Sequence, residues 1–211
     1  MKKYIIVPVL AVLTMVACKK KDDDVSQEVT VSRPTITITG SQFYSIQVGG
    51  TAPSLSATSY DSVLKESYPV DFDQSSLDVN TPGLYVLEAT AKNKYGYVGS
   101  NVVYIAVTNV PASTDLSGTY KRTANNALVH VTKILTGLYS TDDVGGAPTL
   151  AITAYFAHLD DTTIVVPPQP TSAGTLSCEN AKLHMAVGDT SYSYVVVNGN
   201  FGTAVRTFVK Q

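Results

Sequence analysis

Two cysteines and three histidines are the residues of this sequence best suited to nucleophilic or metal chemistry. Cys178 and His184 are close in the chain and would supply a thiolate and its base if the fold paired them. No nucleophile-elbow or cysteine-enzyme signature surrounds them, and no histidine or cysteine pair has zinc-site spacing. We therefore expect no catalytic residue, no metal and no cofactor, and we place Cys178 in a strand or in the core.

Aromatic side chains offer a different chemistry, because a tyrosine ring can stack on a sugar or on a partner while its hydroxyl bonds to it. The chain has 13 tyrosines and no tryptophan. Tyr95 and Tyr97 lie in a predicted turn, and loops at 142–148 and 167–174 are further candidates, since recognition usually sits on loops carried by a rigid scaffold. His158 follows an alternating apolar face and is either a core histidine or a pocket residue. We predict Tyr95, Tyr97 and His158 as ligand-binding residues.

Paired carboxylates at Asp142-Asp143 and Asp160-Asp161 leave a hydrolase as the least favoured alternative. Glycosidase chemistry needs two carboxylates held at a set distance across a cleft. Adjacent residues in a strand point to opposite faces, and acidic pairs in turns are usually solvated. Only a pocket that gathers two of these residues, or one of them with His158, would support hydrolysis.

The N-terminal segment 1–17 has two lysines, an apolar run and a final small residue, which is the layout of a secretory signal. The run is shorter than the roughly 20 residues of a membrane-spanning helix. Its end, Met15-Val16-Ala17-Cys18, resembles the bacterial lipobox. The resemblance implies that 1–17 is removed and that Cys18 is acylated, so that outer-membrane lipid is a partner.

The charged residues after Cys18, three lysines and then three aspartates, predict a flexible tether over 18–32. They also resemble the export signal of surface-exposed lipoproteins of the Bacteroidetes. The resemblance implies an outer-membrane lipoprotein exposed at the cell surface. A formal net charge of −2 gives no footprint for nucleic acid, which we exclude as a partner.

The remainder of the chain predicts an all-β protein with two domains, 33–109 and 115–211. Strict alternation at 35–39 and 85–91, with turns at 81–83 and 93–96, is typical of strands buried on one face. The stretches PTITITG, VGG and TPGLYVLEATAKNKYG resemble bacterial immunoglobulin-like repeats of the HYR, PKD and cadherin-like group. The resemblance implies a β-sandwich over 33–109.

The second domain is expected to be an antiparallel sandwich or a lipocalin-like barrel. Strands are predicted at 118–122, 128–134, 149–158, 162–166, 175–178, 183–187, 191–197 and 203–210, with an Asn198-Gly199 hairpin turn before the last. The opening Leu116-Ser117-Gly118-Thr119-Tyr120 resembles the Gly-x-Trp start of lipocalin-like barrels, with Arg206 available to cap the aromatic ring.

These patterns predict a non-enzymatic, monomeric surface protein that binds a glycan or an envelope protein. The alternative is a structural or cell-adhesion spacer without a small ligand. The fold of 115–211 bears on this choice, because an open mouth and a filled interior lead to opposite expectations.

Overall fold

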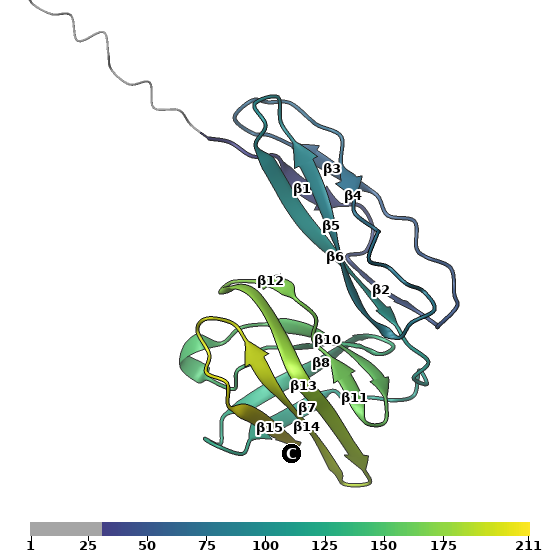
Figure 1. Cartoon of the computed structure of the whole chain (residues 1–211), viewed down its shortest axis with the longest axis vertical. Coiled ribbons are helices and arrows are strands. Elements are labelled where there is room, and N and C mark those ends of the chain that lie inside the picture. The colour runs from purple at the N-terminus through teal and green to yellow at the C-terminus, as the bar shows by residue number, and fades with distance from the viewer. Residues whose placement is uncertain (1–30) are drawn as a thin grey trace, which may run out of the picture. The chain divides into compact units, whose positions relative to one another are not determined.

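The computed structural model describes residues 31–211 as strands joined by turns, with one short 3-10 helix at Pro148–Leu150 (Figure 1). This confirms the predicted all-β class. The predicted signal segment 1–17, Cys18 and most of the predicted tether lie outside the described residues. Within 31–211, no helix is long and apolar enough to cross a membrane.

Six strands between residues 35 and 107 form two small sheets. They are β1 (Thr35–Ile38), β2 (Phe43–Ile46), β3 (Ala57–Tyr60), β4 (Asp71–Phe72), β5 (Gly83–Lys92) and β6 (Val98–Val107). β1 and β3 pair antiparallel, and the other four form a sheet in the order β2-β6-β5-β4, in which β2 runs parallel to β6. The two sheets share a core, because Ile38 and Phe72 each belong to both apolar clusters of this region.

The long β5–β6 hairpin is buried on both faces at one end. Alternation places Leu87 and Ile105 on the face that covers the core of the small sheets. Leu84 and Tyr104 lie on the opposite face and join a separate apolar cluster with residues of the second half of the chain. The hairpin therefore connects the two halves.

Nine strands between residues 118 and 210 form one antiparallel sheet. They are β7 (Gly118–Arg122), β8 (Leu128–Leu135), β9 (Leu138–Thr141), β10 (Ala154–Asp160), β11 (Thr163–Val165), β12 (Gln169–Thr171), β13 (Gly174–Ala186), β14 (Asp189–Val197) and β15 (Val205–Lys210). The order is β11-β10-β9-β8-β7-β15-β14-β13-β12. Consecutive strands are thus neighbours in the sheet, except for β11 and β12, which stand at opposite ends of this order, and β15 also pairs with β7.

The sheet curls until β11 meets β13. The Cys178 N–H donates to the Val166 carbonyl at 2.9 Å, and the Leu183 N–H donates to the Thr162 carbonyl at 2.7 Å. All strands but β12 thereby form a closed ring, and β12 remains outside it as a short edge. Of the two predicted alternatives for this region, the structure is the barrel.

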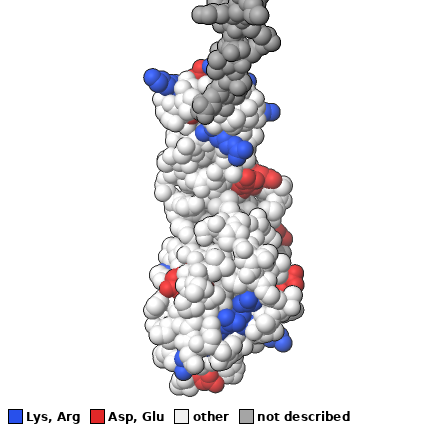
Figure 2. All heavy atoms as spheres, turned by 90° about the vertical axis from the view of Figure 1, so that its left-hand side faces the viewer, with Lys and Arg blue, Asp and Glu red and all other residues white. Residues whose placement is uncertain are grey.

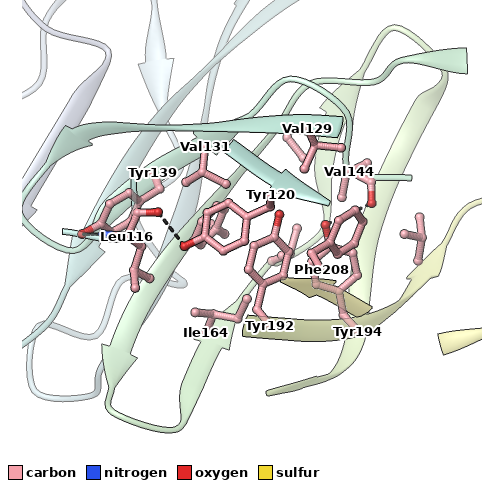
Figure 3. Close-up of a cluster of buried hydrophobic side chains, with 14 of the residues drawn as sticks. Leu116, Tyr120, Val129, Val131, Tyr139, Val144, Ile164, Tyr192, Tyr194 and Phe208 are labelled. Carbon is pink, nitrogen blue, oxygen red and sulfur yellow. Dashed lines mark hydrogen bonds between the residues drawn. The ribbon is translucent and has the colours of Figure 1, made fainter. Parts of the chain in front are cut away.

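Aromatic side chains fill the ring (Figure 3). Tyr192 lies with ring-centroid distances of 4.9 Å to both Tyr120 and Phe208. The Tyr120 hydroxyl donates to the Leu116 carbonyl at 2.7 Å, so a deeply buried polar group is satisfied. The interior is a packed core, and any ligand site must therefore lie on the outside or at an end of the ring.

The outer face of β9 and β10 packs against the β5–β6 hairpin. Leu138 and Ala157 are fully buried in the cluster that contains Leu84 and Tyr104. The Thr108 hydroxyl, just after β6, donates to the His158 carbonyl at 2.8 Å. Residues Ser32–Gln211 accordingly form one compact unit.

Several predicted strands have wrong bounds in the second half. The predicted strand at 149–158 begins with a 3-10 turn, because Pro148 has no N–H to donate to a neighbouring strand. The extended part is Ala154–Asp160. Segments 175–178 and 183–187 belong to one strand, β13, interrupted by a bulge between Glu179 and Lys182. β9 and β12 were not predicted.

Two other local predictions are wrong. Asn198-Gly199 does not form a tight hairpin turn, because the Asn198 side chain instead donates to the Ala173 and Thr175 carbonyls and opens a longer loop. Arg206 does not cap Tyr120. Its guanidinium lies 5.0 Å from the Phe201 ring centroid, and the Lys210 ammonium lies over Tyr120 at 5.9 Å.

Candidate ligand site

The three predicted ligand-binding residues are not brought together. Tyr95 and Tyr97 lie on the turn between β5 and β6, and Tyr95 is 66% exposed. That turn is about 30 Å along the hairpin from Leu84, where β5 meets the second half of the chain. His158 lies in β10 with its side chain fully buried. A joint site is therefore excluded by geometry, and each separate role stays a prediction.

The other sequence candidates for chemistry are also apart. Cys178 packs against the core, where burial raises the pKa of its thiol to about 12. His184 is exposed and lies 3.6 Å from Asp189. Within 31–211, no group of three His, Cys, Asp or Glu side chains is placed to hold a metal ion.

An open hollow of about 450 Å³ lies beside β12, and we call it the Tyr155 hollow. Its lining consists of Ala151, Thr153, Tyr155, Pro170, Thr171 and Ser172. Three of these side chains carry hydroxyls on short stems, one is an aromatic phenol and none is charged. Such a wall can accept and donate hydrogen bonds and offers an apolar ring.

A second hollow of about 290 Å³ lies on the other side of Pro170, and we call it the Glu88 hollow. It is lined by Val86, Glu88, Ser100, Val102, Pro168, Gln169, Pro170 and Thr175. The β5–β6 hairpin forms one wall and β12 with the start of β13 forms the other. Both halves of the described chain therefore contribute to it.

Pro170 separates the two hollows, and Gln169 fixes its position. The Gln169 side chain is buried, its Oε1 accepts from the Tyr155 N–H at 2.8 Å, and its Nε2 donates to the Tyr155 carbonyl at 2.8 Å. The amide thus occupies the place of a neighbouring strand along the free part of β10. This contact holds the short edge strand β12 against β10 of the closed sheet.

Tyr155 is supported from behind by two other rings. Its centroid lies 4.5 Å from that of Tyr104 and 5.0 Å from that of Phe43. Burial, with a smaller contribution from Tyr155, raises the pKa of Tyr104 to about 12, so this hydroxyl stays neutral. A ring held by two others presents a preorganised surface, which reduces the ordering cost of binding.

The electrostatics of the hollows favour an uncharged ligand. Among the described residues that line the two hollows, Glu88 is the one that carries a charge. Figure 2 shows one face of the molecule, on which charged side chains are scattered over a mostly uncharged surface. Hydroxyl groups and one carboxylate can form hydrogen bonds with a polyhydroxyl ligand, and an aromatic ring can stack on it.

Neither hollow supports the hydrolase alternative. His158 and the acidic pairs are absent from both linings. Asp142 accepts from the His130 ring at 2.8 Å, and Asp160 accepts from the N–H and the hydroxyl of Thr162 within its own turn. These carboxylates have local structural partners.

Sequence reasoning found part of this site. The predicted loop 167–174 contains Pro170, Thr171 and Ser172, whereas Tyr155 and Thr153 were missed. Alternation marks Tyr155 as an outward residue of β10, but the sequence does not say what covers that face. The partner hairpin is distant in the chain, so no local signal could identify it.

The fold and the hollows define a class, an all-β protein with an open, mostly uncharged surface site. No family model matches the chain, and no curated protein matches it. Among solved structures, it is similar to the crystal structure of the lipoprotein BT2262 from Bacteroides thetaiotaomicron. The identity is 21%, the match covers 84% of this chain and 100% of the other, and the TM-score is 0.35. A similarity this low carries no argument about fold or function.

Proposed function

We propose that this chain is a lipid-anchored, non-enzymatic surface protein that binds a neutral glycan in the Tyr155 hollow. The observation that carries the proposal is the lining, which combines a supported aromatic ring with the hydroxyls of Thr153 and Ser172 and has no charge. The Glu88 hollow extends the same surface beyond Pro170 and gives room for a second sugar unit.

The location is proposed from the sequence. Segment 1–17 is the proposed signal peptide and Cys18 the proposed acylation site. Acylation of Cys18 would anchor the chain in the outer membrane, since two or three acyl chains give firm attachment. We interpret residues 33–109 as an immunoglobulin-like module that presents residues 115–211 away from the membrane. Intact mass of the native protein tests the anchor, because Cys18→Ser would remove the lipid mass.

A glycan array probed with a soluble chain starting at residue 25 tests the binding function. We expect a neutral oligosaccharide to bind, and Ser172→Trp to weaken binding by at least about tenfold because the indole fills the hollow. Ser62→Trp, at an exposed position outside both linings, is the matched control and should bind normally. Absence of glycan binding, or equal binding by both variants, would contradict the proposal.

An adhesive or spacer role is the second candidate, and the packed contact between the β5–β6 hairpin and β9–β10 favours it. Because this contact leaves no free hinge between the two halves of the described chain, a partner bound at one end would be held at a fixed distance from the other end. If the array is empty and the Ser172→Trp protein still supports attachment of cells to a surface, the spacer function replaces the glycan function.

A further inference from the structure

Two arginines lie on the inner face at one end of the closed sheet. Arg122 ends β7 and is paired with Phe208 of β15, and Arg206 lies two residues before Phe208. Tyr120 and Phe208 are fully buried inside the ring, and alternate residues of a strand share a face. Arg122 and Arg206 therefore point inward as diagonal neighbours, about 7–8 Å apart at the backbone.

Each of the two guanidinium groups forms its hydrogen bonds through its own Nη1 nitrogen. Arg122 donates from Nη1 to the Gly146 carbonyl at 3.2 Å. Arg206 donates from Nη1 to the Ala204 carbonyl at 2.9 Å and to the Gly202 carbonyl at 3.4 Å. The Nε atoms of both arginines are buried and have no hydrogen-bond partner among residues 31–211. The hydrogen bonds of both side chains within the described part of the chain all come from Nη1, which leaves the edge formed by Nε and Nη2 unused there.

The charges of these arginines are not neutralised by an ion pair. Within residues 31–211, neither forms a salt bridge with a carboxylate. Asp143 is buried nearby, but its Oδ1 accepts from the Gly145 N–H at 3.0 Å, and burial raises its pKa, which favours the neutral acid. Arg206 is 5% exposed. A buried guanidinium normally has a charged or hydrogen-bonded partner on each edge.

The loop at this end is shaped around the two side chains. A Cβ on Gly146 would lie 2.6 Å from Arg122 Cδ, and one on Gly145 would lie 2.4 Å from the Phe201 ring, on which Arg206 stacks. Gly146 therefore lets the backbone approach Arg122, and Gly145 lets it approach the Phe201 ring beside Arg206. Arg122 is partly exposed and gives a route from solvent.

We propose that Arg122 and Arg206 form an oxyanion site in which their Nε–Nη2 edges bind a carboxylate, sulfate or phosphate group. This edge matches two oxygens of such a group bidentately, and lysine cannot reproduce it. The site is independent of the glycan proposal, because neither arginine lines the two hollows. Its ligand is a small oxyanion or an acidic group on a larger molecule.

Nitrogen-15 NMR of the arginine side chains tests the proposal directly, because Arg33, Arg122 and Arg206 are the arginines of the chain. Sodium sulfate, phosphate and a hexuronate are titrated separately into the soluble chain at ionic strength matched with sodium chloride. We expect saturable Nε–Hε shifts at Arg122 and Arg206 and none at Arg33. The strongest of the three anions identifies the group that the site prefers.

Two variants separate bidentate binding from simple charge. Arg122→Lys keeps the charge and removes the fork, and it should weaken anion binding by at least about tenfold. Lys121→Gln removes a neighbouring charge and should bind within about twofold of the parent. If Arg122→Lys does not fold, the parent titration still decides. Shifts that are absent, equal at all three arginines, or unchanged in Arg122→Lys overturn the proposal.

Discussion

Gln169 bonds through its side-chain amide to both backbone groups of Tyr155, at 2.8 Å in each case. The Gln169 side chain thus forms the two backbone hydrogen bonds that a neighbouring strand would otherwise form with Tyr155. Because Tyr155 forms the wall of one hollow and Gln169 borders the other, this pair determines the geometry of the whole candidate site.

Gln169→Leu is expected to lower the free energy of unfolding by about 1–3 kcal/mol, because the partly buried N–H and carbonyl of Tyr155 lose their partners. Urea denaturation followed by circular dichroism measures the change. Gln74→Leu, at an exposed position, should stay within about 0.5 kcal/mol of the parent. Equal stability of Gln169→Leu and the parent would show that β12 is held by other contacts.

Gly137→Ala should destabilise the junction between the two halves of the chain. Gly137 has φ of 68°, and a Cβ there would lie 2.5 Å from Thr108 Cγ2. Gly188 has φ of 77° and nothing within 4 Å, so Gly188→Ala isolates the backbone cost of about 1–2 kcal/mol. We expect Gly137→Ala to cost about 1–3 kcal/mol more than Gly188→Ala in urea denaturation.

Thr108→Ser identifies the source of that excess. Serine keeps the hydroxyl that donates to the His158 carbonyl and removes the methyl group that clashes. The double variant Gly137→Ala/Thr108→Ser should recover most of the difference from Gly188→Ala. If the stability changes of Gly137→Ala and Thr108→Ser simply add in the double variant, the excess loss in Gly137→Ala comes from another contact.

The sequence predicted element type well and long-range structure poorly. The Thr35–Ile38 alternation and the turn at 93–96 are local patterns, and both occur as predicted. β12 was missed because Pro170, the two prolines before it and a polar glutamine are typical of a loop, whereas pairing with β13 and the Gln169 contact with β10 make it an edge strand. Local propensity cannot include that energy.

The same limit applies to Asn198-Gly199 and to Arg206. An Asn-Gly pair tolerates a tight turn, but the Asn198 amide gains two hydrogen bonds, to Ala173 in the β12–β13 turn and to Thr175 in β13, and this tertiary contact determines the conformation of the loop. Arg206 was placed over Tyr120 by resemblance alone. Strand register instead puts Lys210 opposite Tyr120 and leaves Arg206 at the other end of β15.

Stability should fall as pH decreases below about 6.5, and His158 should cause part of the loss. Burial lowers the pKa of His158 in the folded state, with Asp160 and Asp161 opposing the effect. Above the unfolded pKa of about 6.5, both states are neutral and the contribution is constant. Below it the unfolded state binds the proton first, so stability decreases by up to about 1.4 kcal/mol per pH unit until the folded pKa is reached.

Urea denaturation of His158→Gln across this pH range measures the contribution. The variant should have a shallower pH dependence than the parent, whatever its absolute stability. His184→Gln, which changes a 62% exposed side chain, should keep the parent slope. A parallel slope in His158→Gln would mean that the imidazole is hydrated in the folded protein.

Cys178 should react with thiol reagents only after unfolding. Its pKa of about 12 reflects burial that outweighs the opposing charge of Arg206. Near pH 8 the folded thiolate fraction is about 10⁻⁴, against roughly a quarter for an exposed cysteine with a pKa of about 8.5. Labelling with iodoacetamide, followed by intact mass of the chain starting at residue 25, should therefore be about a thousandfold slower in buffer than in guanidinium chloride. Rapid native labelling with a midpoint near pH 8.5 would place the thiol in solvent and remove it from the packed face of β13.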